Sequence, residues 1–163
     1  MKNLLKLSLV SLLFVNIALA DNFGGGYPKN PNLTETPGAL CASPSTHRYP
    51  ENINYCNRDV DSYLKNAIIA KYDSLFGYSI RSMKRADFKI DHLIPLCAGG
   101  ANDEKNLWPQ HKSVYAITDP IEPLICQKMA DGKLKQADAV KLVLQAKMNL
   151  DQVPAIIKQI ERM

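Results

Sequence analysis

The sequence has little excess charge, no internal repeat and, after its first twenty residues, no apolar run of the length needed to span a bilayer. A transmembrane helix needs about 20 consecutive apolar residues, so no span is predicted in that part of the chain. The 20 Lys and Arg residues face 16 Asp and Glu residues. Any affinity for a polyanion must therefore come from local clusters of charge, because the total charge is too small.

The first twenty residues have the pattern of a cleavable signal peptide. Lys2 and Lys6 give a positive start, "LSLVSLLFV" is a short apolar stretch, and Ala18-Leu19-Ala20 is a small-x-small cleavage site before Asp21. The sequence therefore predicts a secreted or periplasmic protein. Removal of 20 residues from 163 leaves 143, the size of one domain, with a net charge of +2 because Lys2 and Lys6 are lost.

The four cysteines all lie in the exported part, and an even number in an oxidising compartment favours two disulfides. Three connectivities are open. We favour the pairs that are nearest in sequence, each stabilising the fold by roughly 2–4 kcal/mol. These pairs are Cys41–Cys56 and Cys97–Cys126.

Composition and periodicity divide the exported chain into three parts. Residues 21–40 are rich in glycine and proline and predict a flexible arm, followed by an irregular loop that a disulfide closes. Apolar residues recur with helical spacing from Asn57 to about Tyr72, and again in three segments after Asp119. The prediction is an α+β protein in which a small β-hairpin is carried on a mostly helical body.

The segment "FKIDHLIPLCAGGANDEKNLWPQH", residues 88–111, carries the candidate chemistry. Apolar residues alternate through it as in a strand, Gly99-Gly100 predicts a turn, "NLW" predicts a returning strand, and a helix is expected from about Pro109. A neutral imidazole deprotonates water near neutral pH, and a carboxylate is a suitable ligand for a divalent cation. Asp91 and His92 supply both groups.

The pattern Asp91-His92-x-Ile-Pro-Leu, then Gly99-Gly100, then Asn106-Leu-Trp-Pro-Gln resembles the HNH endonucleases, whose core is a ββα-metal fold. The match covers about 24 residues, and the core would span residues 84–117 of a domain at 41–163. The resemblance implies that His92 is the general base, Asp91 a metal ligand, and Asn106 the residue that pins the loop and orients the histidine. It also implies metal-dependent hydrolysis of nucleic-acid phosphodiester bonds that leaves a 5′-phosphate.

The residue expected to be the second metal ligand departs from the family pattern. The family position falls on Tyr115, a poor Mg²⁺ ligand, and His111 or Asp119 are the alternatives. Zinc-binding relatives carry CxxC pairs, which are absent here. Mg²⁺ is therefore the expected cofactor, with Mn²⁺ or Zn²⁺ as alternatives.

Structural explanations compete with several of these assignments. Strict strand alternation sends Asp91 and His92 to opposite faces unless the strand ends or bends there. His92 alone would fit a structural histidine, and Asn106 a turn residue. Trp108 fits a core position. Cys97 fits a thiol nucleophile or a zinc ligand, although a disulfide is the simpler explanation.

A group of basic residues lies around the motif and would hold a nucleic-acid backbone without reading its bases. The sequence thus predicts a monomeric enzyme acting on DNA, and on RNA as an alternative, with little sequence preference. A secreted binding module that keeps a decayed nuclease motif is the rival hypothesis. The basic residues are Arg81, Lys84, Arg85, Lys89 and Lys112.

Overall fold

The computed structural model describes residues 26–163, so the predicted signal peptide lies outside the described residues. Helices and two small antiparallel sheets make up this part of the chain, which confirms the α+β prediction. The strands are β1 (Thr46–Arg48), β2 (Ile53–Tyr55), β3 (Phe88–His92) and β4 (Leu107–His111). The helices are α1 (Ser62–Phe76), α2 (Lys112–Thr118), α3 (Ile121–Ala130), α4 (Gln136–Met148) and α5 (Val153–Glu161).

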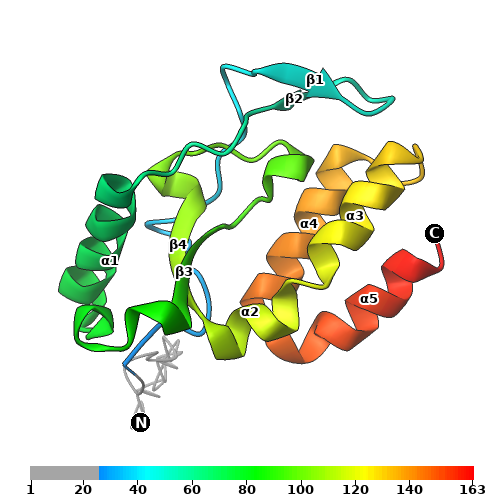
Figure 1. Ribbon diagram of the computed structural model, residues 1–163. Coiled ribbons are helices and arrows are strands. Elements are labelled where there is room, and N and C mark those ends of the chain that lie inside the picture. Colours follow the sequence, from blue (N-terminus) through cyan, green and yellow to red (C-terminus); the bar gives the residue numbers. More distant parts are fainter. Residues whose placement is uncertain (1–25) are drawn as a thin grey trace, which may run out of the picture.

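The β3–β4 hairpin lies at the centre of the molecule, between α1 on one side and the α2–α5 body on the other (Figure 1). One apolar core joins the hairpin to α1 and includes Phe88, Ile90 and Trp108. A second core lies among α3, α4 and α5 and reaches Ile94 just after β3. Because both sides of the hairpin are covered, all five residues of β4 are buried.

The strands of the central hairpin pair antiparallel over their full lengths. Phe88 lies opposite His111, and the ladder runs on to His92 opposite Leu107. The expected returning strand therefore forms. The helix after it, α2, begins at Lys112 and not near Pro109, because Pro109 is paired with Ile90 inside the ladder.

Helix α1 begins later than its sequence pattern indicated. The predicted helical spacing starts at Asn57, whereas the N-cap is Asp61, whose carboxylate accepts a hydrogen bond from the Leu64 amide. The left-handed Gly77 ends the helix at Phe76, one turn beyond Tyr72. Residues 57–61 are thereby left outside any helix or strand and connect β2 to α1.

The two disulfides join the cysteine pairs that the sequence favoured. Cys41 is bonded to Cys56 and Cys97 to Cys126, and the described residues contain no free cysteine. A zinc site or thiol nucleophile at Cys97 is therefore not supported. Two disulfides are typical of an oxidising or extracellular compartment. Among residues 26–163, no helix has the length and hydropathy to cross a membrane.

The part of the predicted flexible arm that the structure describes, residues 26–40, packs against the body. Thr36 is fully buried, and its hydroxyl is 2.8 Å from the Tyr72 hydroxyl. Gly38 donates its amide to the Lys105 carbonyl, and Leu40 forms a β-bridge with Gly100. The glycines and prolines of this segment form turns that let it pack along the hairpin. Composition alone did not indicate this packing.

Candidate functional site

Asn106 holds the loop that follows β3. Its carboxamide oxygen accepts a hydrogen bond from the Ile94 amide at 2.8 Å, while its Nδ2 donates to the carbonyls of Ile94 and Ala101. The side chain is fully buried. Gly100 lies within this loop, and a Cβ there would be only 1.8 Å from the Ile94 carbonyl oxygen. The "GG…N" part of the motif therefore builds one closed loop at the end of β3.

His92 is the last residue of β3, and both of its ring nitrogens have a partner. Its Nδ1 is 3.1 Å from Nη1 of Arg58, and its Nε2 is 3.0 Å from Oδ1 of Asn102. A guanidinium only donates hydrogen bonds, so Nδ1 is the acceptor and Nε2 carries the proton. Asn102 is itself fixed because its Nδ2 donates to the Asn57 carbonyl at 2.7 Å. The histidine is thus held as one neutral tautomer.

Burial keeps this imidazole neutral. The side chain is only 4% exposed. Desolvation, together with the positive charges of Arg58 and Lys147, lowers the pKa of His92 from 6.5 to about 4, although the bond to Asn102 acts in the opposite direction. At neutral pH the ring is therefore available as a base as soon as its Nδ1 is uncovered.

The depressed pKa predicts a pH-dependent stability. The unfolded chain protonates His92 near pH 6.5, whereas the folded chain resists protonation until about pH 4, so folding is favoured above pH 6.5 and this contribution is lost as the pH falls towards 4. We expect the wild type to lose roughly 3 kcal/mol relative to His92→Gln over that interval. Urea unfolding of both proteins at several pH values measures it, and parallel curves would contradict the assignment.

Asp91 points away from His92 and into an ion-pair cluster. Its Oδ2 is 2.7 Å from Nζ of Lys147 on α4, and its Oδ1 is 3.2 Å from Nζ of Lys89. Lys147 also donates to the backbone carbonyl of His92, and Lys89 reaches Asp119 at 2.6 Å. Although burial opposes it, the two ammonium groups lower the pKa of Asp91. Asp91 and Lys147 are both buried.

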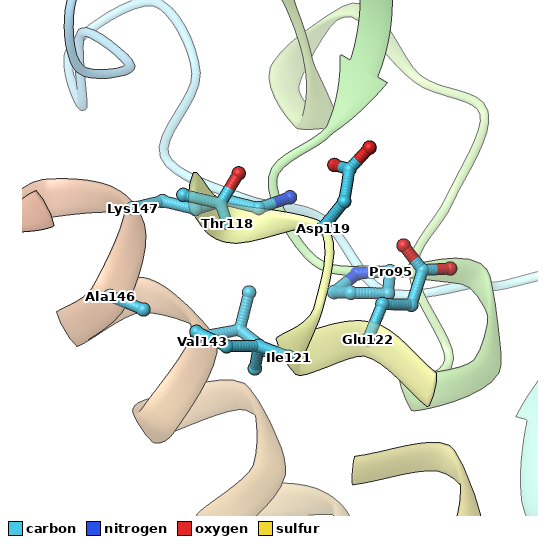
Figure 2. Close-up of a pocket in the computed structure, with 8 residues that line it drawn as sticks. All are labelled: Pro95, Thr118, Asp119, Ile121, Glu122, Val143, Ala146 and Lys147. Atoms are coloured by element: carbon cyan, nitrogen blue, oxygen red, sulfur yellow. The ribbon is translucent and has the colours of Figure 1, made fainter. Parts of the chain in front are cut away.

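A small cavity lies beside this cluster, at the junction of α2, α3 and α4. Figure 2 shows Asp119 and Glu122 with their carboxylates pointing to the same side, near Lys147 and Pro95. The cavity has a volume of about 10 Å³, about the space of one water molecule. A cavity of this size does not admit a nucleotide.

The donors around Asp91 do not fit the Mg²⁺ ion that the resemblance implies. Both carboxylate oxygens are already paired with ammonium groups. Within residues 26–163, no group of three or more His, Cys, Asp or Glu side chains is arranged to hold a metal ion. A divalent cation would have to displace Lys147 from a buried pair, which carries a large desolvation cost.

His111 lies at the other end of the hairpin. The ladder places it opposite Phe88 and three residue pairs from Asp91. Its Nδ1 accepts from the Ser113 amide as the N-cap of α2, and its ring stacks on Tyr27 at 3.9 Å. Tyr115 lies nearer the ion-pair cluster, with its ring centroid 5.0 Å from the Lys89 ammonium. The structure therefore does not bring His111 to Asp91 or His92.

Most of the basic residues that were predicted to bind nucleic acid already have hydrogen-bond or ion-pair partners inside the protein. Arg81 pairs with Asp73, Lys112 pairs with Asp87, and Lys89 pairs with Asp91 and Asp119. Arg85 donates to the Phe88 carbonyl, and Lys84 is exposed next to it. The structure thus shows a partly neutralised surface around the start of β3.

Three residues around the motif were missed by sequence reasoning. Arg58 and Asn102 hold the ring of His92, and Lys147 holds Asp91. Asn102 lies in the loop after Gly99-Gly100, so its position two residues beyond the turn was a usable signal. Arg58 and Lys147 are 34 and 56 residues from their partners and carry no local pattern.

Comparisons with protein-family models, with curated proteins and with solved structures find no match to this chain.

Proposed function

We propose that the protein is an exported nuclease that hydrolyses phosphodiester bonds in DNA, and in RNA where it is accessible, with His92 as the general base. The observation that carries the proposal is the state of this imidazole. It is neutral, its proton is fixed on Nε2 by Asn102, and its Nδ1 lone pair faces the exposed Arg58. A fixed tautomer with one basic nitrogen directed at a surface cation suits the removal of a proton from water beside an anion.

In the proposed reaction, a water molecule near Nδ1 of His92 attacks the phosphorus of the scissile bond. Its proton passes to Nδ1, a new P–O bond forms, and the bond to the 3′ oxygen breaks, so that the products are a 5′-phosphate and a 3′-hydroxyl. The 3′ oxygen takes its proton from solvent. Asn102 keeps accepting from Nε2 and thereby stabilises the imidazolium that forms, while Asn106 holds the loop that carries Asn102.

The positive charge that opposes the phosphate comes from the protein itself in this proposal. The donors at Asp91 do not fit a divalent cation, so the side chains of the chain must bind the phosphate and move the proton. Cationic contacts to phosphate carry no base information, which supports broad substrate choice. Export to an oxidising compartment, secreted or periplasmic, is proposed from the two disulfides together with the signal-like start of the sequence.

A plasmid-cleavage assay with purified protein tests reaction class and cofactor together. Supercoiled plasmid is expected to become nicked and then linear, and the reaction is expected to continue in EDTA because Asp91 is already paired. The same reactions with Mg²⁺, Mn²⁺ or Zn²⁺ added in turn complete the measurement. Cleavage that stops in EDTA and returns with Mg²⁺ would show that the reaction needs a divalent cation, and would contradict a phosphate charge opposed by the protein alone. Intact plasmid under every condition would refute the nuclease.

A second candidate function is a secreted binding module without catalysis. It is favoured by the buried pair of Asp91 and Lys147, which closes the position where the resemblance implies a metal ion. Such a module would retain nucleic acid in a gel-shift assay but leave the plasmid intact. The cleavage assay above separates the two.

A further inference from the structure

Arg58 covers the one basic nitrogen that the proposed reaction needs. Its Nη1 donates to Nδ1 of His92 at 3.1 Å, and its Nη2 donates to the Ile90 carbonyl at 3.0 Å. While this contact persists, no water can donate a hydrogen bond to Nδ1. The histidine is therefore masked in the protein as it stands, and Arg58 is the side chain that must move.

No carboxylate oxygen among the described residues lies within 4.0 Å of the Arg58 guanidinium. By contrast, Arg81, Lys89 and Lys112 all lie within 4.0 Å of an aspartate oxygen. Arg58 is exposed, and its two hydrogen bonds are both to neutral acceptors. A guanidinium has five N–H donors, so three remain free while it touches His92 and Ile90. An unpaired exposed cation with free donors is suited to an anion from solution.

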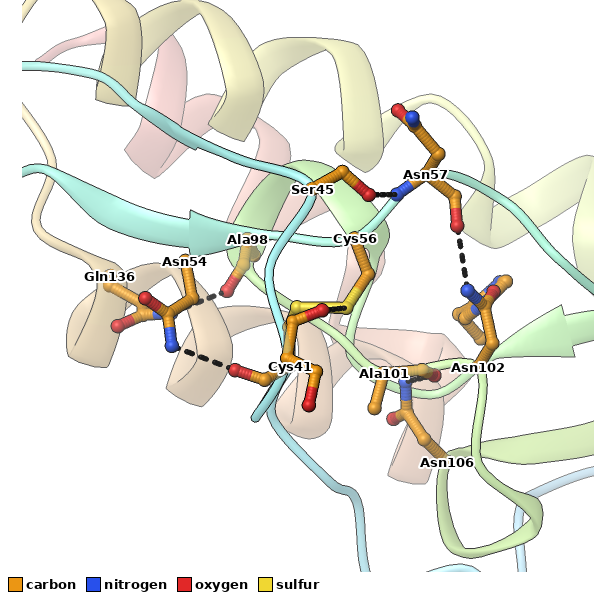
Figure 3. Close-up of a disulfide and its surroundings, with 12 residues drawn as sticks. Cys41, Ser45, Asn54, Cys56, Asn57, Ala98, Ala101, Asn102, Asn106 and Gln136 are labelled. Atoms are coloured by element: carbon orange, nitrogen blue, oxygen red, sulfur yellow. Dashed lines mark hydrogen bonds between the residues drawn. A yellow bond between two sulfur atoms is a disulfide. The ribbon is translucent and has the colours of Figure 1, made fainter.

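The chain immediately before Arg58 is anchored by three contacts. The Cys41–Cys56 disulfide lies two residues before it, and the Asn57 amide hydrogen bonds to the Ser45 hydroxyl. Figure 3 shows the Asn57 carbonyl accepting a hydrogen bond from the side chain of Asn102, the second partner of His92. The backbone at 56–57 is therefore fixed relative to the histidine, while the long Arg58 side chain remains free to change partner.

We propose that Arg58 binds the scissile phosphate of the substrate, and that in moving its guanidinium from Nδ1 of His92 to the phosphate oxygens it uncovers the base. This inference rests on the proposed nuclease function and adds to it a phosphate ligand and a reason why His92 is masked without substrate. A phosphate is a far stronger acceptor for a guanidinium than a neutral imidazole, because both partners are then charged. The substrate phosphate thus binds the Arg58 guanidinium, and this movement leaves Nδ1 of His92 accessible to the attacking water.

Binding is tested separately from cleavage in a His92→Ala background, where turnover is not expected. A fluorescent duplex oligonucleotide is titrated with His92→Ala and with His92→Ala/Arg58→Ala at several salt concentrations. Loss of one phosphate contact is expected to reduce the salt slope by about 1 and the affinity at low salt by about 10-fold. Arg162→Ala in the same background is the control, because Arg162 is exposed after α5 at the far end of the chain. Equal slopes for the Arg58 and control variants would overturn the proposal.

The kinetic arm uses Arg58→Ala and Arg58→Lys with His92 intact. Arg58→Ala is expected to lower kcat/KM by about 100-fold, as for removal of one donor that stabilises the transition state. Added guanidinium ion is expected to restore part of the rate, and Arg58→Lys is expected to fall between the two because it keeps charge but loses the planar fork. Thermal melting of each variant identifies any that does not fold. Rates equal to wild type in Arg58→Ala would overturn the proposal.

The binding and kinetic experiments together distinguish failure of the proposed nuclease function from failure of the proposed role of Arg58. If the wild type does not cleave and the salt slope still falls by about 1, the nuclease function fails while the phosphate contact of Arg58 stands. If the wild type cleaves and neither slope nor rate depends on Arg58, the nuclease function stands and the role of Arg58 fails.

Discussion

Lys147→Met is expected to destabilise the protein by about 3–5 kcal/mol, the largest effect on folding of any single change considered. Lys147 is only 6% exposed, and its ammonium contacts both the Asp91 carboxylate and the His92 carbonyl. Its removal leaves a buried carboxylate with only the partly exposed Lys89 as a partner. Breaking one side of a buried pair costs more than the pair contributes, because the remaining charge stays desolvated.

Urea unfolding at pH 7 measures this prediction, with Lys141→Met as the matched control. Lys141 lies on the same helix, α4, but is exposed. The double variant Asp91→Leu/Lys147→Met is expected to be more stable than Lys147→Met alone, since it leaves no unpaired charge at that position. A Lys147→Met protein as stable as the control would show that the pair contributes nothing to folding.

The central hairpin could be predicted from the sequence because its signals are local. The alternation around Phe88 and Ile90, the turn at Gly99-Gly100 and the returning strand all lie within 24 consecutive residues. The disulfide pairing was also predictable, since the bonded cysteines are neighbours in sequence. Local patterns of this kind are set by backbone preferences and burial on a short length scale.

The partners of Asp91 and His92 could not be predicted, because they come from distant elements. Lys147 belongs to a helix whose apolar face predicts only packing, and its side chain gave no sign that it would be buried. The sequence pattern placed Arg58 in a helix, but Asp61 caps α1, and Arg58 lies in the irregular segment before it, from which its side chain reaches Ile90 of β3. Such contacts depend on how whole elements pack, which a single sequence does not specify.

Strand alternation explains why Asp91 and His92 do not share one set of partners. Alternation along β3 sends Lys89 and Asp91 to the α2–α4 side, while His92 faces Arg58 and the loop of Asn102. This alternation conflicts with a metal site shared by Asp91 and His92. The structure places the two residues in separate clusters: Asp91 in an ion pair with Lys147, and His92 between Arg58 and Asn102.

His92→Ala is expected to reduce cleavage by about 100- to 10,000-fold, the range for loss of a general base. The substitution removes no apolar side chain from either core, so circular dichroism is expected to stay native. His47→Ala is the matched control, because His47 is exposed on β1 and contacts neither the hairpin motif nor Arg58 through any hydrogen bond of its side chain among the described residues. The control is expected to cleave at the wild-type rate.

The most direct measurement is cleavage of a short DNA duplex in ¹⁸O-labelled water, followed by mass spectrometry of the products. We expect the wild type to place one labelled oxygen on each new 5′-phosphate, and His92→Ala to form no product in the same time while His47→Ala does. Unlabelled 5′-phosphates, or equal product from the wild type and His92→Ala, would contradict a water molecule activated by His92.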